Sequence, residues 1–197
     1  MKEPLIEQPA LAPAQGEEEH LSLALANSAI ALTGGHTVDL LGTPAQANHW
    51  LTERGLAPVD VGMREMCATQ LRSLREQIRS LFASRSEGLP ALPAAVRAVN
   101  DAMTRVPTAP LLQWDDKTGP YRTSPHPTTA IVDHALATLA ADASDLLTGP
   151  DADRLTACGS APCNRYLLRY GRRHWCSTRC GDRARAARAY ARRAVSP

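Results

Sequence analysis

The sequence predicts a mainly α-helical protein: a helical N-terminal domain at residues 19–150 with one β-hairpin, then a small C-terminal zinc module at residues 151–197. The module is expected to be treble-clef-like, to contain four cysteines and to end in a basic helix. Three observations support this class. Apolar residues recur at three- and four-residue steps in the first part, four of the five cysteines lie close together in the second, and the C-terminal end is rich in arginine.

Length and composition limit the classes of protein to which this chain can belong. Its 197 residues, 44% of them hydrophobic, are too apolar for a disordered chain and suffice for one medium domain plus a small appendage. No apolar run is long enough to span a bilayer, so we expect no membrane association. Residues 1–18 are rich in Pro, Glu and Gln; they predict a disordered tail without the apolar stretch of a signal peptide, which favours the cytoplasm.

Three helices are expected in the first half of the N-terminal domain. Periodicity allows a helix or a buried strand at residues 21–32, and the alanine content favours a helix. A short helix is expected between Thr43, an N-cap residue before a proline, and Gly55. Asp60 can cap a longer helix over residues 61–84. Its apolar stripe consists of Met63, Met66, Cys67, Leu71, Leu74, Ile78, Leu81 and Phe82, and its arginines lie mostly away from that stripe.

A helix, a hairpin and a further helix complete this domain. Prolines precede the helix expected at residues 91–104. Residues 111–124 alternate apolar and polar side chains around a Lys-Thr-Gly turn, which predicts a β-hairpin. The last helix, at residues 127–147, is expected to end at Gly149 and the proline after it.

The net charge of +2 hides a division between the two parts. Residues 154–197 contain eleven Arg and one acid, a charge of +10, whereas residues 1–153 contain eleven basic and nineteen acidic residues, a charge of −8. A basic block behind an acidic body is typical of a nucleic-acid-binding tail. The alternative is an Arg-rich end that only keeps the protein soluble, since the whole chain has two Lys.

Four of the five cysteines form two close pairs, a pattern that indicates a metal site rather than disulfides in a cytosolic chain: Cys158, Cys163, Cys176 and Cys180. Zinc prefers four soft ligands in a tetrahedron, and four thiolates leave no position for water. One structural zinc ion per chain is therefore expected. His174 can replace a thiolate, although such a histidine is more often a neighbour or a phosphate contact. The fifth cysteine, Cys67, is expected to be a small buried hydrophobe.

The residues after the second cysteine pair predict a strong helix, which Ser177 can cap. Its alanines share one narrow face, expected to dock on the rest of the protein, and its arginines occupy the other faces. Arginine pairs bidentately with phosphate and with guanine edges. The candidate DNA contacts are Arg172, Arg173, Arg179, Arg183, Arg185, Arg188 and Arg192.

At these residues the C-terminal part resembles the CGNR zinc finger family, a bacterial module named after a Cys-Gly-Asn-Arg motif. The motif here reads Cys-Gly-Asp-Arg at residues 180–183, after Arg-Arg-His-Trp-Cys-Ser at 172–177. In that family the finger follows a helical domain called ABATE, in proteins described as stress-induced transcription regulators. Leu-Ala-Leu-Ala-Asn-Ser at residues 23–28 is similar to a Leu-Asp-Phe-x-Asn-Thr motif of that domain. The resemblance covers about residues 20–193 and implies a two-part DNA-binding regulator, not an enzyme.

One departure from the family motif bears on DNA contact. Asp182 replaces the asparagine, and its negative charge would repel a phosphate unless it caps the helix or pairs with an arginine such as Arg179 or Arg185. The second cysteine pair is also one residue shorter than the family's. These departures leave zinc binding expected and bear on the family's mode of DNA contact.

The hypothesis is a cytoplasmic, zinc-containing transcription regulator whose C-terminal module binds DNA. The helical body is expected to form a homodimer, to bind a small-molecule effector between the 21–32 and 127–147 helices, or both; the dimer is inferred from the small DNA surface that a lone module covers. The alternative is an RNA-binding or protein-interaction module, since Arg-rich helices also bind structured RNA and acidic partners. An enzyme is not expected, because residues 20–150 show no nucleophile elbow, phosphate loop or His-Glu metal motif.

Overall fold

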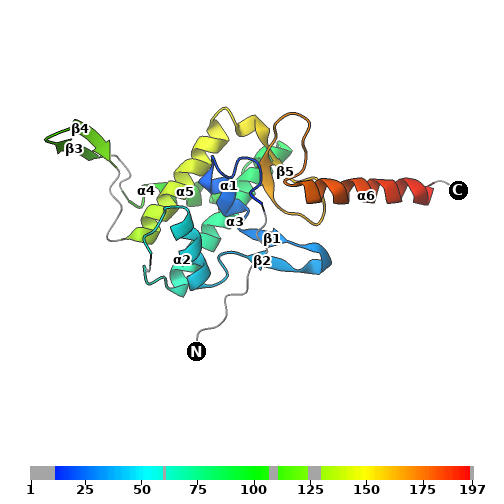
Figure 1. Ribbon diagram of the computed structural model, residues 1–197, viewed down its shortest axis with the longest axis horizontal. Helices are drawn as coiled ribbons and strands as arrows, with labels where there is room; N and C mark the ends of the chain where they lie inside the picture. Colours follow the sequence, from blue (N-terminus) through cyan, green and yellow to red (C-terminus); the bar gives the residue numbers. More distant parts are fainter. Residues whose placement is uncertain (1–11, 60, 107–110, 124–129, 196–197) are drawn as a thin grey trace.

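The computed structural model describes residues 12–59, 61–106, 111–123 and 130–195 (Figure 1). These residues form six α-helices, two short 3-10 helices and three two-stranded antiparallel sheets. The mainly helical class and the small C-terminal module ending in a helix are confirmed. None of the described helices combines the length and the apolar character that a bilayer crossing requires.

The body is built around one long helix, α3 (Glu65–Glu87). It packs against α1 (Leu21–Ala26), α2 (Pro44–Glu53), α4 (Pro93–Thr104) and α5 (Ile131–Thr148). Apolar side chains from all five helices bury one continuous core, whose largest fully buried members include Leu23, Leu25, Leu51, Leu71, Ile78, Phe82, Leu139 and Leu146. The helical periodicity of the sequence therefore identifies most of the core.

The boundaries of α2 and α3 depend on their caps. Thr43 and Gln46 form the capping box of α2, in which the Thr43 Oγ1 accepts a hydrogen bond from the Gln46 N–H (3.2 Å). The N-cap of α3 is Arg64, so that helix begins four residues later than expected; Asp60, the predicted cap, lies outside the described residues. Within α3, Met66 is 68% exposed although its spacing placed it in the core.

The helix expected at residues 21–32 is only half as long. It ends at Ala26, and Ala29–Ala31 form the strand β1, which pairs with β2 (Thr37–Asp39). The connecting 3-10 turn, η1 (Thr33–Gly35), has positive φ angles at Gly34 and Gly35, which glycine adopts without strain. The change from helix to strand is fixed by contacts to residues more than a hundred positions away, described below, which local periodicity does not reveal.

The predicted hairpin is confirmed as β3 (Leu111–Asp115) and β4 (Gly119–Thr123). Its turn is closed by the Asp115 carboxylate, which accepts hydrogen bonds from the N–H groups of Lys117 (2.9 Å) and Thr118 (2.8 Å). The hairpin stands apart from the helices at one end of the molecule (Figure 1). Most of its side chains are exposed.

The predicted disordered tail is corrected for residues 12–18. Ala14 is only 2% exposed, the Gln15 carbonyl accepts a hydrogen bond from the Leu168 N–H (2.8 Å), and the Glu17 carboxylate pairs with Arg165 (2.7 Å). These contacts tie the segment to the C-terminal module, so its Pro- and Glu-rich composition does not prevent packing. The first eleven residues lie outside the described part of the chain.

The C-terminal module begins with η2 (Ala152–Arg154) and an antiparallel pair, β5 (Leu155–Ala157) and β6 (Tyr166–Leu168). Leu155, Tyr166 and Leu168 belong to the core of the body, and the Tyr166 ring meets Phe82 of α3 edge-on, with ring centroids 5.7 Å apart. The module is therefore packed on the body, without an open linker between the two.

The last helix, α6 (Thr178–Val195), extends away from the rest of the protein (Figure 1). Cys180 and Gly181 in its first turn are buried, but Ala187 and Ala191, which were expected on a docking face, are exposed. That expectation is wrong for the single chain, because α6 passes beyond the elements against which its alanines would pack.

Candidate metal centre and basic helix

The four clustered cysteines converge on one point of the C-terminal module. The Sγ atoms of Cys158, Cys163, Cys176 and Cys180 all lie within 4.8 Å of one another. The Cys163–Cys176 and Cys176–Cys180 Sγ distances are both 3.6 Å. Four thiolates around a zinc ion with bonds of about 2.3 Å have Sγ atoms about 3.8 Å apart, so the cluster has the size of a zinc site.

Local backbone hydrogen bonds position each pair of thiols. In the first pair, the Cys158 N–H donates to the Arg165 carbonyl (2.8 Å) and the Cys163 N–H to that of Ser160 (2.9 Å), which folds the β5–β6 connection into a tight knuckle. In the second pair, the Ser177 Oγ accepts from the Cys180 N–H (3.2 Å) at the start of α6, as the sequence predicted. A knuckle and a helix start thus each supply two thiols to one tetrahedron.

The close approach of the thiols shifts their pKa values in opposite directions, so they do not all ionise together without a cation. Hydrogen bonds from Cys163 and Cys176 lower the pKa of the Cys158 thiol to about 2, and the hydrogen bond to Cys158 raises the pKa of Cys163 to about 11. Its neighbours also raise the pKa of Cys176. One thiolate is therefore stable by itself, and a zinc ion at the centre lets the remaining thiols ionise.

Little else holds this part of the module together. Its cluster of buried residues contains only Ala14 and Leu167 besides three of the cysteines, with Cys163 and Trp175 partly buried against it. So small a core cannot stabilise the loops by itself. The four cysteines form a site for one structural zinc ion. Among the described residues, no other group of three or more His, Cys, Asp or Glu could hold a metal.

Arg183 is directed at the cysteine cluster. Its Nε donates to the Ser160 Oγ (3.1 Å), and its Nη2 donates to the Ser160 carbonyl (3.2 Å) and to the Cys180 Sγ (3.2 Å). The guanidinium ties the start of α6 to the first cysteine pair. These contacts give Arg183 a role inside the module.

Asp182 and Trp175 organise the next turn of α6. The Asp182 carboxylate pairs with Arg185, one of the two arginines considered from the sequence, three residues along the helix. The guanidinium groups of Arg185 and Arg188 lie over the Trp175 ring, at 6.0 and 5.6 Å from its centroid. The acid is therefore neutralised locally, and Trp175 directs two arginines.

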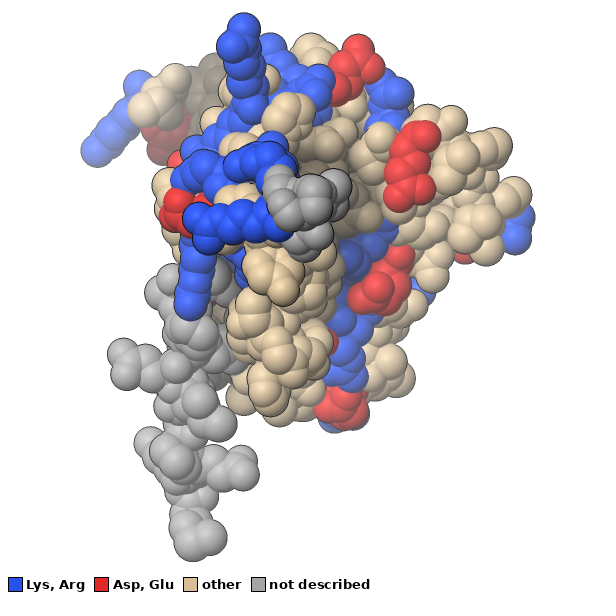
Figure 2. Space-filling view, turned by 90° about the vertical axis from the view of Figure 1, so that its right-hand side faces the viewer, with Lys and Arg blue, Asp and Glu red and all other residues tan. Residues whose placement is uncertain are grey.

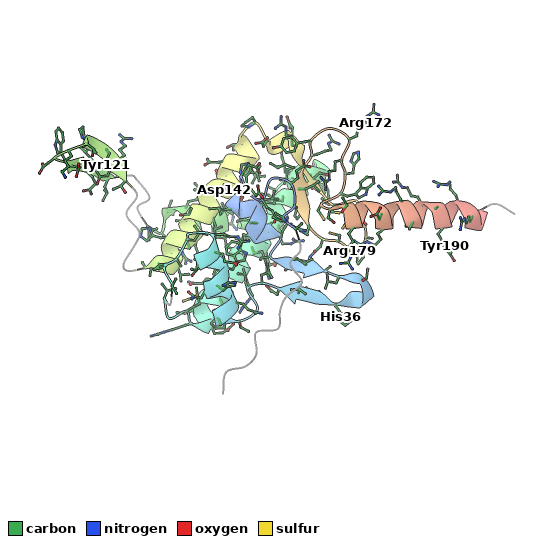
Figure 3. The ribbon with its side chains drawn as sticks, viewed as in Figure 1. His36, Tyr121, Asp142, Arg172, Arg179 and Tyr190 are labelled. Carbon is green, nitrogen blue, oxygen red and sulfur yellow. The ribbon has the colours of Figure 1, made fainter. Side chains whose placement is uncertain are left out.

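The other predicted contacts are exposed around α6 and the loop before it. Arg172, Arg173, Arg179, Arg188 and Arg192 all have exposed side chains. Arg172 lies on the loop on one side of α6 and Arg179 on the opposite side (Figure 3). Viewed towards this end of the molecule, Lys and Arg side chains gather around the helix (Figure 2). We call the protruding helix and these arginines the basic helix surface.

Two asparagines join the module to the body, a structural role that the sequence did not reveal. The Asn27 side chain, 3% exposed, donates to the Tyr166 carbonyl (2.8 Å) and accepts from its N–H (2.7 Å). The Asn164 side chain likewise donates to the Ala29 carbonyl (3.1 Å) and accepts from the Ala31 N–H (2.9 Å). Each amide thus extends a strand of the opposite part. The family motif containing Asn27 was the one available signal.

Arg79 of α3 completes this junction, and Arg75 of the same helix forms a buried ion pair within the body. Arg79 donates to the carbonyls of Ala26 (2.6 Å) and Asn164 (2.9 Å). Arg75, expected on the outer face of α3, is only 5% exposed and binds both carboxylate oxygens of Asp39, at 2.6 and 2.9 Å. Burial would raise the pKa of Asp39, but hydrogen bonds from Arg75 and the Leu41 N–H hold that pKa below its usual value. Helix α3 is amphipathic, but Arg75 and Arg79 point inward because carbonyl or carboxylate groups there accept their hydrogen bonds.

A cavity of about 310 Å³ lies between the C-terminal ends of α3 and α5 and helix α4. Its walls are mostly apolar, including Leu81, Leu89, Val99 and Leu147, with Arg85 and Asn100 among the polar residues. The sequence placed a pocket between the 21–32 and 127–147 helices, whereas this cavity lies at the other helices that α5 contacts.

Comparison with protein families agrees with this division of the chain. Residues 19–150 match the ABATE family, described as "Putative stress-induced transcription regulator", and residues 154–193 match the CGNR zinc finger. Both are regulator or zinc finger families and neither is a family of enzymes. A search of curated proteins gave no match. The chain therefore belongs to the ABATE family and has a CGNR zinc finger after its ABATE domain.

Proposed function

We propose that this protein is a zinc-dependent transcription regulator whose basic helix surface binds duplex DNA. One observation carries the proposal: α6 leaves the body as an exposed helix with arginines on several sides, while its first turn is fixed at the cysteine cluster. Among the described side chains of α6, those at residues 185–188 and 190–193 are exposed and not packed in the core. A polyanion alongside the helix would supply contacts to its arginines.

The dimensions of α6 suit the major groove. Its 18 residues span about 27 Å, and a helix is narrow enough to enter a groove about 12 Å wide. The proposed DNA contacts are five of the six exposed members of the predicted set, Arg172, Arg173, Arg179, Arg188 and Arg192; the sixth, Arg185, is paired with Asp182. Arg183 and Arg185 would instead hold the first turns in place, through Ser160 and Asp182.

The zinc ion has a structural role in this proposal. Cys158, Cys163, Cys176 and Cys180 close its coordination shell, so it has no open position at which to activate water. Its effect on DNA binding is indirect: it orients α6 and keeps the Arg172–Trp175 loop beside it.

The protein would act in the cytoplasm, and its ABATE domain would regulate DNA binding. Its cavity between α3, α4 and α5 suits a small apolar effector, with Arg85 and Asn100 offering polar contacts. A homodimer would present two fingers to neighbouring sites and increase the DNA surface that is covered.

Structured RNA is the second candidate ligand, because Tyr190 on α6 is 77% exposed. Aromatic side chains next to arginines stack on unpaired bases. Duplex DNA offers no unpaired base, so Tyr190 distinguishes the two ligands. Tyr190→Ala should leave duplex binding nearly unchanged and weaken RNA binding about tenfold.

The test is selection of genomic DNA fragments by the zinc-loaded full chain, with affinity then measured across salt concentrations and in competition with structured RNA. We expect an enriched duplex whose binding is lost in Arg188→Ala. Arg97→Ala is the matched control, because Arg97 is equally exposed but lies on α4 in the body. Equal affinity for all duplexes would reduce the protein to a non-specific binder, and preference for RNA would replace DNA as the ligand.

A further inference from the structure

We propose that the β1–β2 hairpin of the ABATE domain is a second contact with the same DNA, touching the phosphate backbone while α6 occupies the groove. This inference rests on the proposed function and adds to it. It makes the ABATE domain part of the DNA-binding surface as well as a regulatory body.

The first observation is the position of the hairpin. β1 and β2 project from the body on the side from which α6 extends, and Arg179 lies between α6 and the hairpin, which ends near His36 (Figures 1 and 3). Viewed towards this side, an uncharged knob lies below the cluster of basic side chains (Figure 2). A duplex placed along α6 on this side would also pass the hairpin.

The second observation is that the zinc finger itself fixes the hairpin. Asn164 directly follows the zinc-site residue Cys163, and its amide binds the backbone of Ala29 and Ala31 on both sides of Ile30. Arg79 holds the Asn164 carbonyl from beneath (2.9 Å). The β1 strand of the hairpin is therefore hydrogen-bonded directly to the finger, next to its zinc site.

The third observation is charge. Residues 29–38 contain no Asp, Glu, Lys or Arg, although residues 1–153 carry a net charge of −8. The nearest acid, Asp39, is paired with Arg75. The end of the hairpin can therefore approach phosphates without the repulsion that most of the body would exert.

The fourth observation is the chemistry of the exposed tip, Thr33–Thr37. Two threonine hydroxyls and the His36 imidazole are hydrogen-bond donors of the kind that contact phosphate oxygens. A Cβ on Gly35 would meet no atom within 4 Å, so the backbone itself is accessible to a neighbouring strand. Such contacts position a protein on DNA without reading its sequence.

The experiment measures the affinity of the full zinc-loaded chain for its selected duplex after a charge is introduced at the tip. A negative charge about 4 Å from a phosphate should weaken binding about fivefold in water, so His36→Glu should raise the Kd by about that factor and His36→Lys should lower it. Gln113→Glu and Gln113→Lys are the matched controls, because Gln113 is exposed on the other hairpin, at the far end of the molecule. Neither control should change the Kd.

Three results overturn the inference and are distinguishable. If wild type binds the duplex and Arg188→Ala abolishes that binding, but both His36 variants bind as wild type does, the proposed function stands and the hairpin is not a contact. If the wild-type protein binds no duplex at all, the proposed function fails and the hairpin inference fails with it. Equal effects of the His36 and Gln113 variants would indicate a general charge effect and also reject the contact.

Discussion

The body and the zinc finger are held together by different physical means, although they pack against each other. The body buries a continuous core of leucines, alanines and aromatic rings drawn from five helices. Around its cysteines the finger buries only Leu167, together with Ala14 of the N-terminal segment, and this part depends on its metal site. Each part can therefore be destabilised separately. The β5–β6 pair packs against both parts, so it determines whether destabilising one part also destabilises the other.

The largest effect is expected on removing zinc. Metal binding contributes about 10–16 kcal/mol to structural zinc fingers, far more than the small cluster around Ala14 and Leu167 can replace. After chelation, the segment from Cys158 to Cys180 and helix α6 should lose protection against hydrogen exchange, whereas α3 and α5 should keep theirs. Hydrogen exchange read by mass spectrometry measures both in one experiment.

The matched pair of variants for this prediction is Cys176→Ser and Cys67→Ser. Cys176 is buried in the cluster, and Cys67 is partly buried on α3, away from it. The first substitution should reduce zinc content and the second should not. Unchanged exchange from Cys158 to Cys180 without zinc would show that apolar packing alone maintains the finger.

The next largest effect is expected on the stability of the body, when a side chain of its apolar core is shortened. Leu71 is fully buried in α3, so Leu71→Ala should lower the free energy of unfolding by about 2–5 kcal/mol through lost burial and a cavity. Met66→Ala, on the same helix but at a residue that is 68% exposed, should cost little. Urea unfolding followed by circular dichroism measures both. Equal losses in the two variants would contradict the packing described for α3.

The junction between the parts should respond to Asn27→Ala. This change leaves the N–H and carbonyl of the buried Tyr166 without their partner, at about 1–3 kcal/mol for an unsatisfied buried group. We expect faster hydrogen exchange in β6 and little change in zinc content. Asn100→Ala, at an exposed position on α4, is the control. If β6 exchanges at the same rate in both variants, the Asn27 amide does not hold the junction.

The sequence predicts those elements of the protein that are determined by residues close together in the chain. Helical spacing identified α3 through Leu71, Ile78 and Phe82, and the Thr43 cap identified α2. Cysteine spacing predicted a site of four residues that do meet in the structure, because each pair lies in its own tight turn. These elements need no knowledge of distant residues.

The features that sequence reasoning missed depend on distant partners. Residues 29–31 are apolar and alanine-rich, and they become a strand because Asn164 offers them hydrogen bonds from 133 and 135 positions away. Arg75 is buried because Asp39 and Ser28 receive it. The tail around Ala14 is ordered by β6. In each case a few polar contacts between segments distant in the sequence outweigh local composition.

The smallest effect that we predict is on the affinity for DNA when Asp182, the acid on α6, is replaced. Asp182 pairs with Arg185, so one arginine of the basic helix surface is neutralised in the free protein. Asp182→Asn removes one negative charge, releases Arg185 and should lower the Kd for duplex DNA about threefold to fivefold, because one additional charge then faces the phosphates. The stability should change by less than about 1 kcal/mol, since both side chains are mostly exposed. A Kd that rises in this variant would show that the Asp182–Arg185 pair orders α6 for binding, and that its structural role outweighs its charge.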